Sequence, residues 1–130
     1  MRIYKTKVFL RFQRKEGVAD AALCEAIARA NEGLIDADLG RGLIKQRVPR
    51  EGAGRRGGFR TIVAYRAGAR AVFIYGFAKN VRDNIAAADE REMADTGALL
   101  LGLDARGIET MILGGELWEV ECDDEKDAEG

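Results

Sequence analysis

Three segments near the middle of the chain are rich in β-branched and aromatic residues, and turn-forming stretches separate them. The segments are GLIKQRVP (42–49), FRTIVAYR (59–66) and RAVFIYGFAK (70–79), and this composition is typical of strands. Only Ala67 and Gly68 are expected to connect the second segment to the third, which favours an antiparallel hairpin. The sequence therefore predicts a small antiparallel β-meander, against which the rest of the chain must pack.

Helical patterns precede the predicted meander. After a short strand at residues 2–5, we expect Thr6 to cap a helix over KVFLRFQRKE that ends at Gly17. Asp20 is expected to cap a second helix. The buried stripe of this second helix is predicted to be Leu23, Ile27, Ala30 and Leu34. A turn is expected at residues 36–42.

A helical pattern returns after the meander at residues 85–103, with Gly97 as its weak point. We expect a short helix around residues 108–113, a strand at 116–121 and a disordered tail, DDEKDAEG. This order predicts an α+β fold: two N-terminal helices packed on a small antiparallel β-meander sheet, with a C-terminal helix. One domain is expected at residues 1–103, followed by an acidic C-terminal extension at 104–130 that holds the strand and the tail.

Charge is distributed unevenly along the 130 residues, although the formal net charge is only −1. Residues 41–82 carry eleven Lys or Arg and one acidic residue, whereas residues 83–130 carry three basic and fifteen acidic residues. This polarity favours a polyanion as the ligand of the middle of the chain.

Residues 52–57 match the pattern G-x-G-x-x-G, but their context excludes a dinucleotide-binding loop. That motif requires a helix after the glycines, and here a predicted strand begins at Phe59. A Walker-type loop requires Lys and then Ser or Thr where this chain has Gly58 and Phe59. We therefore expect a long loop between two antiparallel strands, and its arginines are Arg50, Arg55 and Arg56.

The strands on either side of this loop are also basic. Strand alternation places Lys45 and Arg47 on one face. If Val48 pairs with Phe59, then Arg47 lies opposite Arg60, with Cβ atoms roughly 5 Å apart. Like charges that face each other across strands destabilise a sheet, so their presence is more simply explained if an anion lies between them. Arginine suits phosphate oxygens because its planar fork donates two hydrogen bonds.

At these residues the sequence resembles the RelE/ParE superfamily of bacterial type II toxins, in particular its HigB-like and phage-derived RelE branch. The resemblance is carried by the segments IKQRV (44–48), GRRGGFR (54–60) and FIYGFAKN (73–80), and it covers residues 1 to about 100. It implies a RelE-like microbial ribonuclease fold. It also implies a cytoplasmic toxin that cuts mRNA on the ribosome and inhibits translation, and that a cognate antitoxin protein holds inactive.

Carried over residue by residue, the resemblance implies a catalytic set. The set comprises Lys45, Arg47, Arg60, Lys79 and, at the same strand end, Arg82. It also implies that Arg50, Arg55 and Arg56 bind ribosomal RNA, through contacts that need no sequence readout. RelE itself has an arginine after the strand-end lysine and a tyrosine further along, where this chain has Asn80 and a position near Ala86. The general acid is therefore not identified by the resemblance.

The chain contains no histidine, so any RNA cleavage must depend on Lys and Arg, with no metal or other cofactor expected. We interpret Lys45 as the base, Arg47 and Arg60 as phosphate clamps, and Lys79 as a second clamp or the acid. Tyr65 and Tyr75 are candidates for base stacking, although such residues more often belong to the core.

Two alternative functions stay open on the same fold. One is a gyrase-poisoning toxin of the ParE type, and the other is a non-catalytic nucleic-acid-binding regulator. The basic trio favours the ribonuclease, since a gyrase poison has no need of a phosphoryl-transfer site.

Cys24 and Cys122 have no metal-binding spacing and give little basis for a disulfide framework. Cys24 is expected to be a packing residue of the second helix. The N-terminus lacks the apolar stretch of a secretory signal, and no apolar run approaches the roughly 18 residues of a membrane span. We therefore expect a cytoplasmic protein with no membrane partner.

Overall fold

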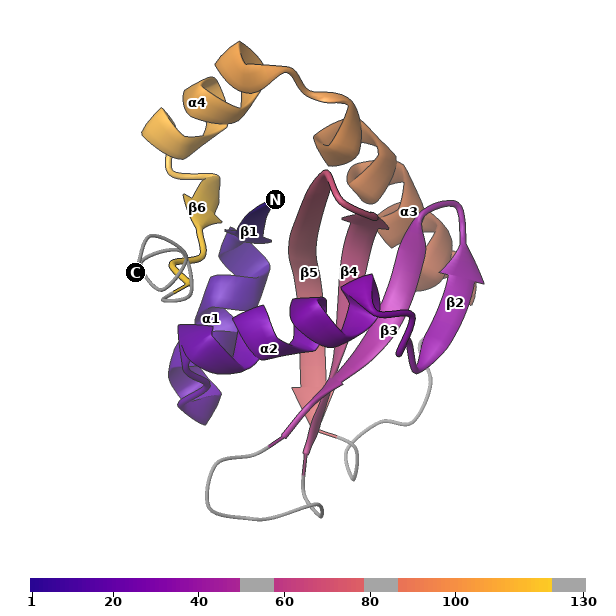
Figure 1. Cartoon of the computed structure of the whole chain (residues 1–130). Coiled ribbons are helices and arrows are strands. Elements are labelled where there is room, and N and C mark those ends of the chain that lie inside the picture. Colours follow the sequence, from indigo (N-terminus) through magenta and orange to yellow (C-terminus); the bar gives the residue numbers. More distant parts are fainter. Residues whose placement is uncertain (50–57, 79–86, 123–130) are drawn as a thin grey trace, which may run out of the picture.

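The computed structural model describes residues 1–49, 58–78 and 87–122. Within these residues the fold is α+β, with four helices and one six-stranded mixed sheet in the order β2-β3-β4-β5-β1-β6 (Figure 1). The elements are β1 (Arg2–Thr6), α1 (Lys7–Glu16), α2 (Asp20–Asn31), β2 (Ala37–Gly40), β3 (Leu43–Val48), β4 (Phe59–Arg66), β5 (Arg70–Ala78), α3 (Ala87–Gly102), α4 (Ala105–Leu113) and β6 (Leu117–Glu119).

The predicted meander forms the centre of the sheet, where β3, β4 and β5 pair antiparallel. The prediction of a small antiparallel sheet understated the size of the sheet, because three further strands extend the meander. On one side β1 pairs parallel with β5 and β6 pairs antiparallel with β1. On the other side, β2 pairs with β3 in the segment expected to be only a turn. Period-2 alternation indicates which residues of a strand share a face, but it does not indicate which strand pairs with it. The parallel pairing of β1 with β5 could therefore not be predicted from this pattern.

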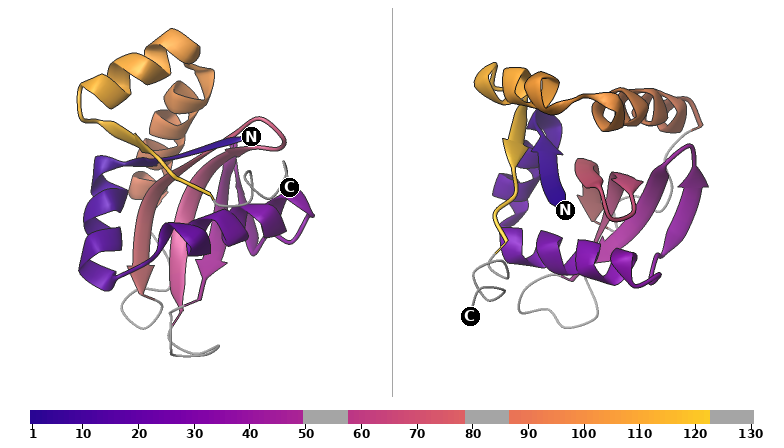
Figure 2. Two further views of the ribbon diagram at one scale, coloured as in Figure 1. Left: turned by 60° about the vertical axis from the view of Figure 1, so that its left-hand side comes forward. Right: turned by 45° about the horizontal axis from the view of Figure 1, so that its top comes forward.

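Helices cover both faces of the sheet (Figure 2). One face packs against α1 and α2, with a core that includes Phe9, Leu23 and Ile27. The other packs against α3 and α4, with a core that includes Leu100, Leu101 and Ile108. The right-hand view of Figure 2 shows α2 on one side of the sheet and α3 and α4 on the other. These two faces are called the α2 face and the α3 face below.

The first helix begins and ends where the sequence predicts. The backbone N–H of Phe9 donates to Oγ1 of Thr6 over 3.2 Å, which caps the N-terminus of α1. Gly17 follows the helix in the left-handed conformation, with φ of 71°. This is the conformation that makes glycine the usual residue just after a helix.

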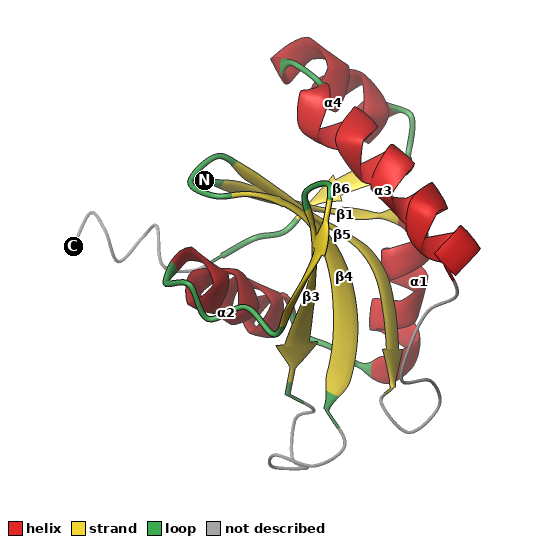
Figure 3. Cartoon of the chain, turned by 90° about the vertical axis from the view of Figure 1, so that its right-hand side faces the viewer, coloured by secondary structure: helices red, strands yellow, loops and turns green. Residues whose placement is uncertain are grey.

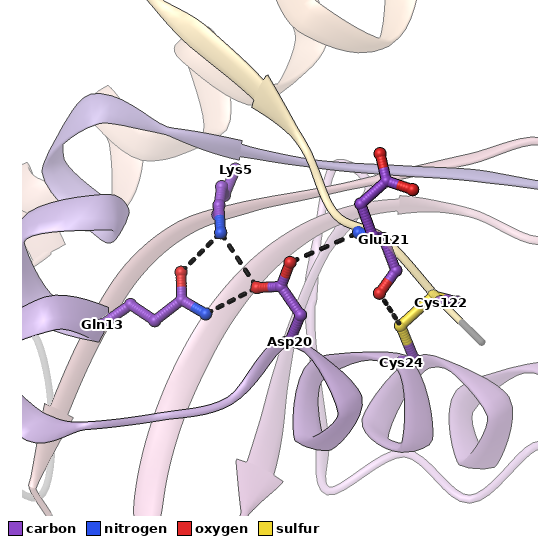
Figure 4. Close-up of polar contacts among 6 residues, drawn as sticks. All are labelled: Lys5, Gln13, Asp20, Cys24, Glu121 and Cys122. Atoms are coloured by element: carbon purple, nitrogen blue, oxygen red, sulfur yellow. Dashed lines mark hydrogen bonds and ion pairs between the residues drawn. A yellow bond between two sulfur atoms is a disulfide. The ribbon is translucent and has the colours of Figure 1, made fainter.

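The predicted cap of α2 was wrong. Ala19 is the N-cap, and its methyl group cannot accept a hydrogen bond. The Asp20 side chain is directed elsewhere. The Asp20 carboxylate accepts from Nζ of Lys5 (2.9 Å) and Nε2 of Gln13 (2.7 Å) (Figure 4). The predicted buried stripe holds at its first three positions, but Leu34 is exposed because α2 ends at Asn31.

Gly97 lies within the continuous helix α3, although it was expected to weaken that helix. A Cβ at this position would lie 3.0 Å from Cβ of Ala64 on β4. The missing side chain therefore lets α3 approach the sheet closely, and this contact accounts for a glycine in the middle of the helix.

The segment after α3 also packs against the sheet. The helix and strand expected there form α4 and β6, and Val120 N donates to the carbonyl of Ile3 over 2.8 Å. Glu121 N donates to Oδ2 of Asp20 over 3.3 Å (Figure 4). The tail that was expected to be disordered, residues 123–130, lies outside the described residues.

Cys24 and Cys122 form a disulfide, which corrects the expectation of unpaired cysteines. Their Cα atoms lie 5.8 Å apart although 98 positions separate them in the sequence. The pairing arises because the chain leaves β6 alongside α2 (Figure 4). Neither cysteine has a local sequence pattern that reports this long-range proximity.

Candidate nucleic-acid interface

Lys45 and Arg47 share one face of β3, as alternation predicts. Both are half-buried, whereas Ile44, Gln46 and Val48 are buried on the opposite face. Ile44 and Val48 belong to the core of the α2 face. Lys45 and Arg47 therefore lie on the α3 face.

Arg60 joins this pair from the neighbouring strand. The register of β3 and β4 pairs Arg47 with Arg60 and Val48 with Phe59, which confirms the predicted alignment. Lys45 pairs with Ile62, a residue of the α3-face core. The side chains of Lys45, Arg47 and Arg60 thus occupy two adjacent rows of one sheet face, and they are called the basic trio below. Directly opposed arginines have Cβ atoms roughly 5 Å apart and repel each other, so an anion between them would offset this cost.

The two arginines of the basic trio lie at one end of the sheet. Figure 3 shows the ends of β3, β4 and β5 that lead into or out of the undescribed segments side by side at this end. Arg47 is the second-last residue of β3, and Arg60 is the second residue of β4. The sheet thus brings together basic residues from the strands that precede and follow residues 50–57 in the sequence.

Gln46 fixes the strand between Lys45 and Arg47. Its side chain is fully buried. Nε2 donates to the carbonyls of Ala26 (2.9 Å) and Leu34 (3.0 Å), and Oε1 accepts from Asp36 N (3.2 Å). The Gln46 carbonyl accepts from Oγ1 of Thr61 over 2.7 Å. These contacts tie β3 to α2, to the segment after it and to β4, which sets the direction of the two basic side chains.

The backbone of Arg47 is held from both sides. Its N–H donates to Oδ2 of Asp36 over 2.5 Å. Its carbonyl accepts from Nη2 of Arg29 on α2 over 2.6 Å. Both partners bind the main chain of Arg47, so these two contacts hold the end of the strand without involving the guanidinium group.

Gly58 leaves room for the Arg47 side chain. A Cβ at Gly58 would lie 3.2 Å from Nε of Arg47 and 3.2 Å from the carbonyl oxygen of Val48. Such distances are tighter than ordinary van der Waals contacts, so with a larger residue at this position Arg47 and the Val48 carbonyl would have to shift by a few tenths of an ångström. The glycine just before Phe59 therefore belongs to the architecture of the basic trio.

Two aromatic residues of β5 continue the rows of the basic trio. Tyr75 pairs with Ile62 and Phe77 pairs with Arg60, and their ring centroids lie 6.0 Å apart. Tyr75 is half-buried, whereas Phe77 is buried. Tyr75 therefore belongs to the same sheet face as the basic trio and has part of its surface accessible to solvent.

Tyr65, the other residue considered for stacking, is occupied elsewhere. Its hydroxyl donates to Oδ1 of Asn31 on α2 over 2.5 Å. Burial raises the pKa of the Tyr65 phenol. Tyr65 packs against the core of the α2 face, away from the basic trio.

The family model for the RelE toxin of RelE/RelB toxin–antitoxin systems matches residues 1–120 of this chain. The chain belongs to the RelE toxin family. No curated protein is significantly similar to it in sequence. Membership in this family confirms the resemblance to the RelE/ParE superfamily of type II toxins. It also implies a cognate antitoxin protein as partner of this RelE-family toxin.

Five of the predicted site residues of this RelE-family toxin lie outside the described residues. They are Lys79 and Arg82 of the catalytic set and Arg50, Arg55 and Arg56 of the RNA-binding set. The structure brings the other three predicted residues, the basic trio, onto one face. Sequence reasoning missed Gln46 as the residue that fixes this face, although a polar side chain on the apolar side of a strand was a visible signal.

The described residues of the RelE-family toxin contain neither a cluster of potential metal ligands nor a helix that could cross a membrane. In residues 1–49, 58–78 and 87–122, no three His, Cys, Asp or Glu side chains gather as potential metal ligands. None of the helices in these ranges is both long and apolar enough to cross a membrane.

Proposed function

We propose that this RelE-family toxin is a metal-independent, ribosome-dependent mRNA endoribonuclease of the HigB-like branch, which inhibits translation in the cytoplasm. The observation that carries the proposal is the direct pairing of Arg47 with Arg60, with Lys45 in the adjacent row of the same face. RelE-family toxins are generally endoribonucleases. Two arginines that face each other across neighbouring strands suit a phosphate bound between them.

The basic trio can supply the main electrostatic requirement of RNA cleavage. When a 2′-hydroxyl attacks the adjacent phosphate, negative charge accumulates on the phosphoryl oxygens. Arg47 and Arg60 approach this point from two strands and can each donate hydrogen bonds to these oxygens. Fixed donors of this kind stabilise the transition state more than the ground state.

Lys45 is proposed as the base that assists deprotonation of the 2′-hydroxyl. It lies one row from the arginine pair on the same face. Removal of the proton and stabilisation of the phosphoryl oxygens would thus come from adjacent residues, with the attacking and leaving oxygens in line. Lys79 is proposed as a second clamp or as the acid that protonates the leaving 5′-oxygen, and Arg82 follows it after Asn80 and Val81.

The loop arginines have a different proposed role. Arg50, Arg55 and Arg56 lie in the sequence between the two basic strands, and they are proposed to bind the backbone of ribosomal RNA. Such contacts neutralise phosphates and are independent of sequence, so the affinity for ribosomes is expected to fall steeply as salt rises. The ribosome would also orient the mRNA over the basic trio.

The proposal is tested by inducing the toxin in bacteria and mapping the new 5′ ends of mRNA within translated regions. The wild-type protein is expected to produce cuts in step with the reading frame, because the ribosome presents the substrate. Lys45→Ala and Arg60→Ala are expected to abolish these cuts. Arg11→Ala and Lys15→Ala are matched controls, since both residues are exposed on α1, and they should cut as the wild type does.

The alternative functions give different results in this experiment. Intact mRNA together with double-strand breaks in DNA would point to a gyrase poison. Intact mRNA and intact DNA would point to a non-catalytic regulator. Cuts that persist at full level in Lys45→Ala and Arg60→Ala would place the chemistry outside the basic trio and contradict the proposal.

A further inference from the structure

A pocket of about 460 Å³ lies on the α3 face, between β5 and α3. Ile74 and Tyr75 line it from β5, Met93 lines it from α3, and the start of α1 lies at its rim. Ile74 is buried, whereas Tyr75 and Met93 are half-buried. The pocket therefore has a flat aromatic side chain beside aliphatic and thioether groups.

The pocket adjoins the basic trio through the register of the sheet. Lys45, Ile62 and Tyr75 occupy one row across three adjacent strands. Neighbouring strands lie about 4.8 Å apart, so the backbone of Tyr75 lies roughly 10 Å from that of Lys45. A ligand with a phosphate on the basic trio can therefore place its next group in the pocket.

The polar groups of the pocket have the opposite charge to those of the basic trio. Asp89 and Glu92 line the pocket from α3, and Thr96 adds a hydroxyl one turn further along. Glu92 and Thr96 are exposed, and Asp89 is half-buried. Carboxylates repel a phosphate, so a nucleotide is expected to lie with its phosphate on the basic trio and its base in the pocket.

A nucleobase fits this combination of groups. Proteins that read single-stranded RNA stack bases on aromatic side chains and hydrogen-bond their exposed edges. A carboxylate only accepts hydrogen bonds, and it pairs with exocyclic amino groups, as acidic residues do with the amino group of cytosine. Adenine, cytosine and guanine carry such a group, whereas uracil has none, and its single ring N3–H lies between two carbonyl oxygens that a carboxylate would repel.

We propose that this pocket binds the base of an mRNA nucleotide next to the scissile phosphate, with Tyr75 stacking on it and Glu92 selecting a base that carries an exocyclic amino group. This inference rests on the proposed ribonuclease function and adds a source of sequence preference to it. Glu92 is a specificity-determining residue in this scheme, and the basic trio performs the cleavage.

The test compares cleavage maps of translated mRNA for the wild type, Glu92→Gln and Tyr75→Leu. The wild type is expected to disfavour uridine at one fixed position beside the cut. Glu92→Gln is expected to remove this bias while cutting continues, because an amide both donates and accepts hydrogen bonds. Tyr75→Leu is expected to cut about tenfold more slowly, because it removes the aromatic ring on which the base stacks. Glu109→Gln, at an exposed position of α4, is the control and should keep the wild-type bias.

A bias against uridine that persists unchanged in Glu92→Gln would overturn the inference while leaving the ribonuclease function intact. The same holds if Glu92→Gln instead weakens binding of the antitoxin and leaves the cleavage map unchanged, because the pocket would then hold a protein side chain. Circular dichroism of each variant separates these outcomes from a failure to fold.

If the wild type cuts no mRNA, the proposed function fails, and a binding measurement then decides the inference alone. Ligand-observed NMR of the purified full-length chain with AMP, CMP, GMP and UMP provides this readout. Binding of the first three in preference to UMP, with the preference lost in Glu92→Gln, supports the base pocket. Equal binding of all four nucleotides overturns it, and so does binding that is unchanged in Tyr75→Leu.

Discussion

Gly58 and Arg47 show how the basic trio depends on a residue that carries no functional group. A Cβ at Gly58 would lie 3.2 Å from Nε of Arg47. The same Cβ would lie 3.2 Å from the carbonyl oxygen of Val48. The Arg47 side chain can shift more readily than the Val48 carbonyl, because Val48 belongs to a strand that pairs with β4 at this point.

Gly58→Ala is therefore expected to reduce cleavage by about tenfold while the protein stays folded. The added methyl group displaces the guanidinium group of Arg47, and small misplacements of a positioning group lower rates by about this order or more. The measurement is the cleavage rate on programmed ribosomes, together with the urea midpoint of unfolding. Gly102→Ala is the matched control, because a Cβ there meets no atom within 4 Å. Equal rates for the two variants would show that Arg47 does not need this space.

Residue patterns predicted the basic trio but not what holds it. Alternation along β3 was enough to place Lys45 and Arg47 together, and the assumed pairing of Val48 with Phe59 is the one observed. The role of Gln46 depends on Ala26 and Leu34, which come from another part of the chain. A single sequence gives no distance between such segments, so this support could be seen only in the fold.

At the scale of elements, local signals predicted local structure well. Both ends of α1 follow from Thr6 and Gly17, whose roles depend only on their immediate neighbours. The prediction for Asp20 was wrong because its carboxylate has stronger partners than the N-terminus of its own helix. Lys5 comes from β1 and Gln13 from α1, so this cluster joins three elements (Figure 4). The strand β2 was missed because ADLG has none of the β-branched residues typical of strands.

Asp20 is expected to make the stability of this N-terminal cluster depend on pH. Burial alone would raise the pKa of Asp20, but hydrogen bonds from Gln13 and Lys5 and the charge of Lys5 hold it below its usual 3.8. A carboxyl group with a lowered pKa stabilises the fold above pH 3.8, and this contribution is lost as the pH falls through its pKa in the folded state.

Asp20→Asn should consequently lower the free energy of unfolding by about 1 kcal/mol at pH 7, with a difference that shrinks towards pH 2. The estimate is modest because the Asp20 side chain is 29% exposed, whereas that of Lys5 is only 9% exposed. Urea unfolding across this pH range measures the difference. Asp95→Asn is the control, since Asp95 forms an exposed ion pair with Arg41. A difference that stays constant with pH would contradict the assignment.

At the scale of the whole molecule, the C-terminal segment closes the fold through contacts far apart in sequence. β6 adds an edge strand beside β1, and Leu117 and Val120 enter the two cores. Cys122 then bonds to Cys24 on α2. The predicted division into residues 1–103 and 104–130 stays a prediction. The acidic composition of residues 104–130 suggested this division, but composition does not indicate how a segment packs.

The disulfide is expected to stabilise the oxidised protein by about 4 kcal/mol, because it closes a long loop and restricts the unfolded chain. Thermal unfolding with and without dithiothreitol measures this effect. The reductant should lower the melting temperature of the wild type and leave that of a Cys24→Ser/Cys122→Ser variant unchanged. Equal melting temperatures of the wild type in both buffers would mean that the bond does not form in solution.

The central claim is that the basic trio is the RNA-cutting site of this RelE-family toxin. Its most direct test is the single-turnover rate of mRNA cleavage on purified, programmed ribosomes, measured for the wild type, Arg60→Ala and Arg11→Ala. Loss of one donor to developing charge typically slows a reaction about 100-fold or more. The account predicts such a loss for Arg60→Ala and a wild-type rate for Arg11→Ala. A wild-type rate for a folded, ribosome-bound Arg60→Ala would contradict it.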